Sequence, residues 1–238
     1  MNNESRVPDH PRVLVSREVT STAETLVMAL GIIGFDAHFV ATGAEMIHQT
    51  RRRGPDTMLL DTTLPDLGGV EVCRQLRREG IDTPVVFLSS RTAVEDKCHA
   101  LAMGGDDYVT IPFDLTELNA RLRALVRRCR RGARATEISD RRLGAAGVEL
   151  DEDTREVRLR GTAVQLSTTE FALLRLLLRN AGRVVPKGKI LDTVWNYGFQ
   201  GESGVMETYI YTLRRKLDDA GRSLIRTVRG AGYMLYAG

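Results

Sequence analysis

The sequence has few cysteines and no long apolar run, and these absences narrow its class. No stretch approaches the roughly 18 consecutive apolar residues that a membrane-spanning helix needs. The three cysteines show no metal-ligand spacing; Cys73 and Cys98 are expected to pack internally, and Cys129, within a basic run, to be an exposed thiol. Residues 1–10 are polar and carry acids, unlike a signal peptide, and predict a disordered tail. The sequence therefore predicts a cytoplasmic protein.

The 238 residues of the chain suffice for two domains of ordinary size, and its charge is distributed unevenly between them. Residues 141–238 contain 16 Lys and Arg against 11 Asp and Glu, whereas residues 1–140 contain 18 against 20. A basic C-terminal part suggests a polyanionic partner such as nucleic acid, although this excess is also compatible with ordinary surface charge.

Strand and helix patterns alternate through the N-terminal half. Five strand–helix units in about 120 residues predict a doubly wound parallel sheet, in which functional residues lie at the C-terminal ends of the strands. The strands are predicted at 12–16, 37–40, 57–61, 84–88 and 107–110, and the helices at 20–34, 44–53, 70–79, 94–103 and 115–128.

Asp61 ends the apolar run 58–60 at the expected functional edge of the sheet. An aspartate there is a plausible phosphate acceptor, but this chemistry needs a divalent cation held by carboxylates and a positive side chain for charge balance. Only Glu18 adds a carboxylate near the end of the first strand, beside Arg17, and Ile111 stands where a lysine would be wanted.

This half resembles a two-component receiver domain over residues 11–130. The resemblance rests on Leu60-Asp61, Leu64-Pro65-Asp66, Phe87-Leu88-Ser89-Ser90, Gly105-Asp106-Asp107-Tyr108 and Ile111-Pro112-Phe113. It implies that Asp61 is the phospho-acceptor, that Ser89 and Tyr108 form the switch, and that Thr63 lends its carbonyl to a metal held by Glu18 and Asp61.

Receivers normally carry two acids where this chain has Arg17 and Glu18, and a lysine where it has Ile111. A cation at Arg17 would repel Mg²⁺ by several kcal/mol at an effective dielectric near 20. We therefore expect weak or absent Mg²⁺-dependent phosphorylation. We further hypothesise that Arg17 pairs with Asp61 and replaces the missing charge; the alternative is that Arg17 points into solvent and the site is merely degraded.

The same resemblance implies a homodimer. In the OmpR and PhoB family, receivers dimerise through complementary charges on the fourth helix, fifth strand and fifth helix. The matching pairs here are Lys97 with Glu117, Asp107 with Arg121, and Asp106 with Arg128. Taken singly, each residue is an ordinary solvated surface charge, worth about 0–1 kcal/mol in an exposed pair. Dimerisation without phosphorylation would explain why the residues of the dimer face match the family while those around the phosphate acceptor do not.

A basic run, 127–134, extends the last receiver helix, and residues 131–143 read as a flexible linker. Beyond it, Ser167 and Glu170 form a capping box that opens an apolar helix at 171–178. Strands are expected at 148–150, 156–159 and 164–166, helices at 187–195 and 205–217, and a hairpin at 225–228 and 233–236. Met206, Ile210, Leu213 and Leu217 give the third helix its core-facing side.

Residues 144–238 resemble the winged-helix DNA-binding domain of the same family. The matching motifs include Val194-Trp195, Leu213-Arg214-Arg215-Lys216-Leu217 and Thr227-Val228-Arg229-Gly230-Ala231-Gly232-Tyr233. Gly104-Gly105-Asp106-Asp107-Tyr108 and Trp195-Asn196-Tyr197 further suggest the PhoP-like subgroup. The implied DNA contacts are Val205, Glu207, Thr208, Tyr209, Tyr211, Thr212, Arg214, Arg215 and Arg229. Loop 196–204 matches a segment that contacts RNA polymerase in some members.

The sequence thus predicts a non-enzymatic transcriptional regulator with an atypical receiver, a double-stranded DNA partner, and Mg²⁺ binding that is weak or not required. The main alternative is an ordinary response regulator phosphorylated at Asp61 by a sensor histidine kinase. A haloacid-dehalogenase-type hydrolase would need an aspartate at position 63, which is threonine. A pure interaction adaptor would leave Arg214, Arg215 and Arg229 without a purpose.

Overall fold

A five-stranded parallel sheet organises the N-terminal half of this computed structural model, which describes residues 10–17, 20–132, 142–195, 204–218 and 223–238. The strand order β2-β1-β3-β4-β5 is that of a doubly wound, flavodoxin-like sheet, as the sequence predicts. Every residue of β3 and β4 is buried, because helices cover both faces. The strands are β1 (Arg12–Ser16), β2 (Asp36–Phe39), β3 (Thr57–Asp61), β4 (Val85–Ser89) and β5 (Asp107–Thr110).

Alternate residues of these strands feed two separate apolar layers. Val13, Leu59 and Val86 belong to one buried cluster, whereas Leu14, Met58 and Leu60 belong to the other. This alternation follows from the two-residue period of a strand. The covering helices are α1 (Thr20–Ile32), α2 (Gly43–Arg53), α3 (Gly69–Arg78), α4 (Val94–Ala102) and α5 (Leu115–Gly132).

The C-terminal half is a winged-helix domain built around three helical segments. A four-stranded antiparallel sheet precedes them, and a three-stranded sheet in the order β10-β12-β11 closes the domain. The first sheet contains β6 (Arg142–Ala145), β7 (Val148–Asp151), β8 (Val157–Leu159) and β9 (Thr162–Ala163). The rest comprises α6 (Thr168–Arg179), β10 (Val185–Pro186), α7 (Lys187–Ile190), the π-helical η1 (Leu191–Trp195), α8 (Gly204–Leu217), β11 (Ile225–Val228) and β12 (Gly232–Leu235).

Three strands of this half differ from the sequence prediction, and one of them, β10, was not predicted. β6 begins at Arg142, inside the segment assigned to the linker, because it pairs with β7 so that Leu143 lies opposite Leu150. β9 lies at Thr162–Ala163, before the run 164–166 that was expected to form a strand. β6 and β9 are defined by their pairing partners, which local alternation does not reveal. The linker residues 133–141 lie outside the described residues.

The core of the winged-helix domain is the one that the helical spacing predicts. Met206, Ile210, Leu213 and Leu217 of α8 are all buried. The rings of Trp195 and Tyr209 pack together with centroids 5.4 Å apart. The third helix therefore turns its apolar side inward.

The predicted capping box opens α6. The Ser167 hydroxyl accepts a hydrogen bond from the Glu170 amide, and the Glu170 carboxylate accepts one from the Ser167 amide at 2.8 Å. The same carboxylate, fully buried, lies 2.6 Å from Lys216 Nζ on α8. Glu170 thus joins the start of α6 to the third helix.

Replacing Glu170 by alanine should lower the free energy of unfolding of this domain by about 2–3 kcal/mol, because it breaks a buried ion pair and a cap together. The 28% exposure of the Lys216 side chain keeps this below the full cost of an unpaired buried charge. Fluorescence of Trp195, the single tryptophan, during urea unfolding measures the loss. Glu156→Ala, which removes an exposed carboxylate 3.5 Å from Arg158, is the matched control and should change little.

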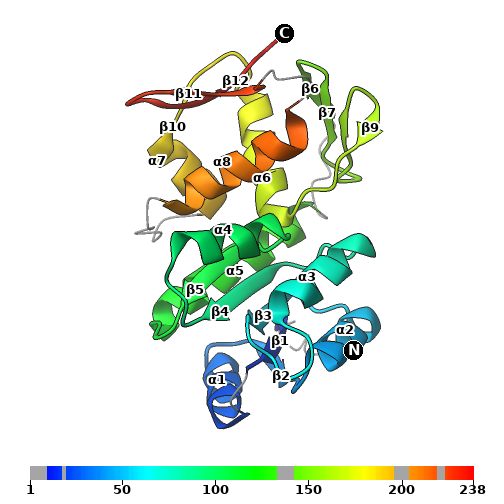
Figure 1. Cartoon of the computed structure of the whole chain (residues 1–238), viewed down its shortest axis with the longest axis vertical. Helices are drawn as coiled ribbons and strands as arrows, with labels where there is room; N and C mark the ends of the chain where they lie inside the picture. The colour runs from blue at the N-terminus through cyan, green and yellow to red at the C-terminus, as the bar shows by residue number, and fades with distance from the viewer. Residues whose placement is uncertain (1–9, 18–19, 133–141, 196–203, 219–222) are drawn as a thin grey trace, which may run out of the picture.

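The two halves pack against each other in this structure. Figure 1 shows α8 lying against α4, and the start of α6 close to α5. The covered surface of the receiver comprises parts of α4, α5 and the turn before β5. This surface includes Asp106, one of the residues for which the sequence predicts dimer contacts.

Candidate functional sites

Asp61 lies at the C-terminal end of β3 and is 7% exposed. Its Oδ1 accepts a hydrogen bond from the Thr63 amide at 3.0 Å. Arg17 directly follows β1, the neighbouring strand, and its Nε lies 3.9 Å from Asp61 Oδ2. The Arg17 side chain is 15% exposed, so it does not point into solvent. The structure thus brings together the two residues that the pairing hypothesis joins.

The Arg17–Asp61 contact is an ion pair without close hydrogen-bond geometry. At 3.9 Å it is longer than a charge-assisted hydrogen bond, and Arg17 Nε has no hydrogen-bond partner among the described residues. At such a separation two unit charges attract by about 4 kcal/mol at an effective dielectric near 20, before desolvation is counted. Arg17 therefore places positive charge beside the predicted acceptor.

Magnesium binding at Asp61 stays a prediction. No group of three or more His, Cys, Asp or Glu side chains capable of holding a metal occurs within the described part of the chain. The second predicted carboxylate, Glu18, lies outside the described residues. The Arg17 guanidinium beside Asp61 would repel a divalent cation.

The predicted switch residues lie on the adjoining strands. Ser89 ends β4 and is buried; its hydroxyl oxygen accepts hydrogen bonds from the Thr62 hydroxyl at 2.8 Å and the Arg91 amide at 3.2 Å. The Tyr108 hydroxyl on β5 donates to the Arg91 carbonyl at 3.0 Å. Burial raises the pKa of Tyr108. Both side chains thus contact the segment between β4 and α4.

Ile111 follows β5, and its amide donates to the Ser89 carbonyl at 2.8 Å. Its side chain packs against the apolar layer that contains Val13 and Leu88. The position therefore supplies packing, and its side chain brings no positive charge to the end of the sheet.

The predicted dimer residues make contacts within one chain. Asp107 Oδ2 lies 2.9 Å from Arg121 Nη1, and Arg121 also pairs with Glu117. Lys97 is buried at 7% exposure, and Asp106 is fully buried. The side chain of Arg128 lies outside the described ones. Pairing of these residues between two chains stays a prediction.

Seven of the nine predicted DNA-contact residues are either clearly exposed or buried. Tyr211, Arg215 and Arg229 are exposed. Val205, Thr208, Tyr209 and Thr212 are buried in this arrangement of the two halves. Their role at DNA therefore stays a prediction, and the buried ones would have to become accessible first.

Glu207 and Arg214 hold the domain's own elements together. Glu207 Oε1 lies 2.6 Å from Lys187 Nζ on α7. Arg214 Nε donates to the Ile225 carbonyl at 2.9 Å, and its Nη2 to the Thr227 hydroxyl at 2.8 Å. Arg214 thus links the hairpin strand β11 to α8 through hydrogen bonds.

The cysteines differ in exposure. Cys73 is buried, as predicted, and burial raises the pKa of its thiol to about 11. Cys98 and Cys129 are half-buried, so Cys129 is less exposed than its basic surroundings predict. Each of these two lies near a threonine of the winged-helix domain: Cys98 Sγ is 3.1 Å from Thr208 Oγ1, and Cys129 Sγ is 3.9 Å from Thr168 Oγ1. Packing of the two halves therefore accounts for the partial cover of Cys129.

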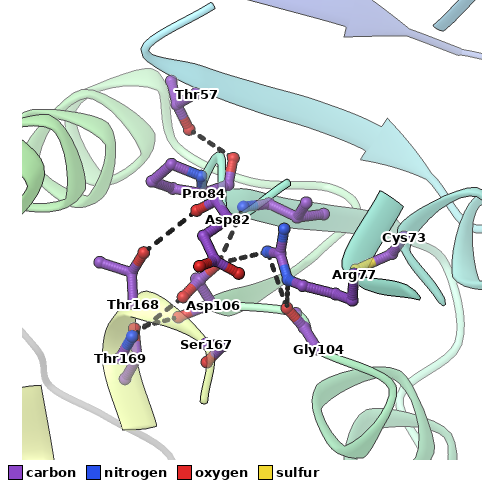
Figure 2. A network of polar contacts seen from close by, with 12 residues as sticks. Thr57, Cys73, Arg77, Asp82, Pro84, Gly104, Asp106, Ser167, Thr168 and Thr169 are labelled. Atoms are coloured by element: carbon purple, nitrogen blue, oxygen red, sulfur yellow. Dashed lines mark hydrogen bonds and ion pairs between the residues drawn. The ribbon is translucent and has the colours of Figure 1, made fainter. Parts of the chain in front are cut away.

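Arg77 and Thr169 were not predicted to be functional. Arg77 lies on α3 and binds Asp106, which in turn binds Thr169 on α6 (Figure 2). Arg77 lies in no predicted motif, and Thr169 lies within the Ser167–Glu170 capping box but was given no role of its own, because the contacts of both residues depend on how two folded surfaces meet. Across the described helices, none is long and apolar enough to cross a bilayer.

Comparison with known proteins places both halves in described families. Residues 13–123 match the response regulator receiver domain, and residues 161–235 match the C-terminal domain of transcriptional regulatory proteins. The chain is 43% identical over 223 residues, 94% of each chain, to the probable transcriptional regulatory protein TcrX of Mycobacterium tuberculosis.

Solved structures share the fold. A point mutant of RitR superposes with a TM-score of 0.80 at 23% identity, covering 96% of this chain and all of the other. DrrB of Thermotoga maritima, described as an OmpR/PhoB homologue, gives a TM-score of 0.50 at 26% identity, covering 95% and 99%. The chain belongs to the OmpR/PhoB-type response regulators, transcription factors that join a receiver to a winged-helix DNA-binding domain.

Proposed function

We propose that this chain is a sequence-specific transcriptional regulator whose receiver dimerises largely without phosphorylation. The observation that carries the proposal is Arg17 Nε, 3.9 Å from Asp61 Oδ2. A fixed cation at this position takes the place of the charge balance that Mg²⁺ and a lysine provide in other receivers. The apolar packing of Ile111 supports the same conclusion, because no lysine clamps a phosphoryl group there.

The proposal also includes the remaining finer assignments. The chain acts as a binding protein and not as an enzyme, in the cytoplasm, and belongs to the PhoP-like subgroup. Its partners are duplex DNA, a second copy of itself through the receiver, and RNA polymerase through loop 196–204, nearly all of which lies outside the described residues. Mg²⁺ binding is weak or not required.

DNA reading is assigned to the exposed side of α8 and to the hairpin. Arg215 on α8 and Arg229 after β11 are exposed cations that a phosphate backbone would attract. Tyr211, 55% exposed on the same helix, is a candidate for base contact. A helix of this kind fits the major groove, about 12 Å wide.

The test duplex is one that the wild-type chain selects from a random-sequence pool. Alanine at Arg215 or Arg229 should lower the affinity of the chain for this duplex. Each loss of a phosphate contact should reduce the salt dependence of log K by about one. Fluorescence anisotropy across a salt series measures both quantities. Arg158→Ala, which removes an exposed arginine on β8, is the matched control and should leave affinity and slope unchanged. Equal slopes for all four proteins would refute the assigned DNA-binding surface.

The alternative function is an ordinary response regulator phosphorylated at Asp61 by a sensor histidine kinase. The position of Asp61 at the end of β3, beside the Ser89-bearing end of β4, favours it. Under this alternative Glu18 and Asp61 would suffice to hold the metal. Direct phosphorylation of the purified chain separates the two functions.

A further inference from the structure

A line of hydroxyl groups crosses the receiver from the end of β3 to β5. The Thr62 hydroxyl, one residue after Asp61, donates to the Ser89 hydroxyl oxygen at 2.8 Å. Burial raises the pKa of Tyr108, and a hydrogen bond that Ser89 donates to this phenol opposes the rise. The Tyr108 hydroxyl in turn donates to the Arg91 carbonyl at 3.0 Å. Each hydroxyl therefore donates to the next group, from the acceptor site to the segment before α4.

The main chain of Thr62 is fixed on both sides. Its amide donates to the Leu88 carbonyl at 3.1 Å, and its carbonyl accepts the Gly69 amide at 3.2 Å where α3 begins. The residue is half-buried. Little further ordering is needed for its hydroxyl to reach Ser89, so this bond loses less conformational entropy than one between two mobile surface side chains.

Residue 91 is where the switch hydroxyls bind the main chain. The Arg91 amide donates to Ser89 Oγ at 3.2 Å, and the Arg91 carbonyl accepts from Tyr108. Residues 90–95 are exposed, so these bonds hold a segment that has little buried surface. Arg91 Nη1 also lies 3.3 Å from Asp96 Oδ1 in the first turn of α4. The start of α4 is therefore held through both hydroxyls.

The line of hydroxyls ends on two elements that carry predicted dimer contacts. Lys97 lies on α4, and Asp107 precedes Tyr108 on β5. The family resemblance implies that Ser89 and Tyr108 respond to a phosphoryl group on Asp61. In this chain Ser89 already has a partner beside Asp61, because the Thr62 hydroxyl binds it without a phosphoryl group.

We propose that Thr62 is a positioning residue of the receiver switch: its hydroxyl holds Ser89, and through Ser89 and Tyr108 the segment 90–93, in the arrangement that dimerises without phosphate. Arg17 balances the charge of Asp61, and Thr62 supplies the contact to Ser89. The inference deepens the proposed function and rests on it for dimerisation alone, because the hydrogen bonds lie within one chain.

Hydrogen exchange at the Arg91 amide tests the line of hydroxyls. Thr62→Val removes the hydroxyl but keeps the shape of the side chain, and should speed exchange of this amide about fivefold, as expected for the loss of one hydrogen bond. Thr62→Ser restores a hydroxyl and should exchange as wild type does. Thr63→Val, the same change at the adjacent exposed residue, is the matched control. Equal Arg91 exchange in Thr62→Val and Thr63→Val would overturn the proposal.

A double-mutant cycle with Ser89→Ala shows whether Thr62 acts through Ser89. Ser89→Ala removes the acceptor of both the Thr62 hydroxyl and the Arg91 amide, so it should speed Arg91 exchange at least as much as Thr62→Val does. In the Ser89→Ala background, Thr62→Val should add nothing, because the bond between the two residues is already lost. Additive effects of the two substitutions would contradict the proposed route.

Sedimentation equilibrium without a phosphodonor measures the consequence for dimerisation. Thr62→Val should weaken self-association about fivefold, the same factor as the lost hydrogen bond, whereas Thr62→Ser and Thr63→Val should match wild type. Faster Arg91 exchange in Thr62→Val with unchanged self-association would refute the role of Thr62 in dimerisation. A wild-type chain that stays monomeric until a phosphodonor is added would refute the proposed function, and Arg91 exchange would then still decide whether Thr62 positions Ser89.

Discussion

Alanine at Gly69 should lower the free energy of unfolding of the receiver by about 3 kcal/mol, the upper end of the usual cost of overpacking. Gly69 begins α3 where the helix meets the end of β3. A Cβ there would overlap the backbone carbonyl oxygen of Asp61 and lie 2.9 Å from Leu60 Cγ. Neither atom is the far end of a flexible side chain, so α3 or the Asp61 strand end must shift.

The adjacent glycine is a matched control for Gly69. A Cβ on Gly68 would approach nothing closer than the Thr62 carbonyl oxygen at 3.4 Å, and its φ of −54° suits alanine. Urea unfolding followed by far-ultraviolet circular dichroism measures the free energy of unfolding of the receiver. Trp195 fluorescence in the same experiment reports the unfolding of the winged-helix domain as a reference. Equal stability of Gly68→Ala and Gly69→Ala would show that α3 does not depend on this close approach.

The double variant Arg17→Asp, Ile111→Lys should become phosphorylated by a small-molecule phosphodonor with Mg²⁺, whereas wild type should not. Aspartate beside Glu18 removes the cation next to Asp61 and adds a carboxylate ligand for Mg²⁺. Lysine at 111 adds the positive side chain that stabilises a transferring phosphoryl group. Intact mass after incubation with the phosphodonor measures the gain.

Two controls make the gain interpretable. Adding Asp61→Asn to the double variant should abolish the mass shift, which would assign the modification to Asp61. Arg17→Ala, which removes the cation without adding a ligand, should give a smaller gain than the double variant. A double variant as inert as wild type would show that Arg17 and Ile111 are not what suppresses phosphorylation.

Much of the fold could be predicted from local pattern. Buried apolar runs such as 58–60 fix the parallel strands, and the Ser167–Glu170 capping box fixes the start of α6. β6 could not be predicted, because its four residues are defined by pairing with β7 rather than by their own alternation. The strand lies next to the basic run in the sequence, and its first residues were therefore assigned to the linker.

The sequence predicted the contact at Asp61 but not the contact between the two domains, for a similar reason. Asp61 ends β3 and Arg17 directly follows the neighbouring strand β1, so their approach could be anticipated from the strand pattern. The contact of Asp106 with Thr169 joins residues 63 positions apart in sequence and belongs to two domains. It depends on how two finished surfaces fit, for which no residue spacing is informative.

Phosphorylation of the purified wild-type chain by a small-molecule phosphodonor with Mg²⁺, read by intact mass alongside Asp61→Ala, tests whether this regulator works without phosphate. We expect no phosphoryl adduct, together with duplex binding that the phosphodonor does not alter. A one-phosphoryl mass gain that disappears in Asp61→Ala and tightens duplex binding would contradict this expectation, and would establish the chain as an ordinary phosphorylated switch.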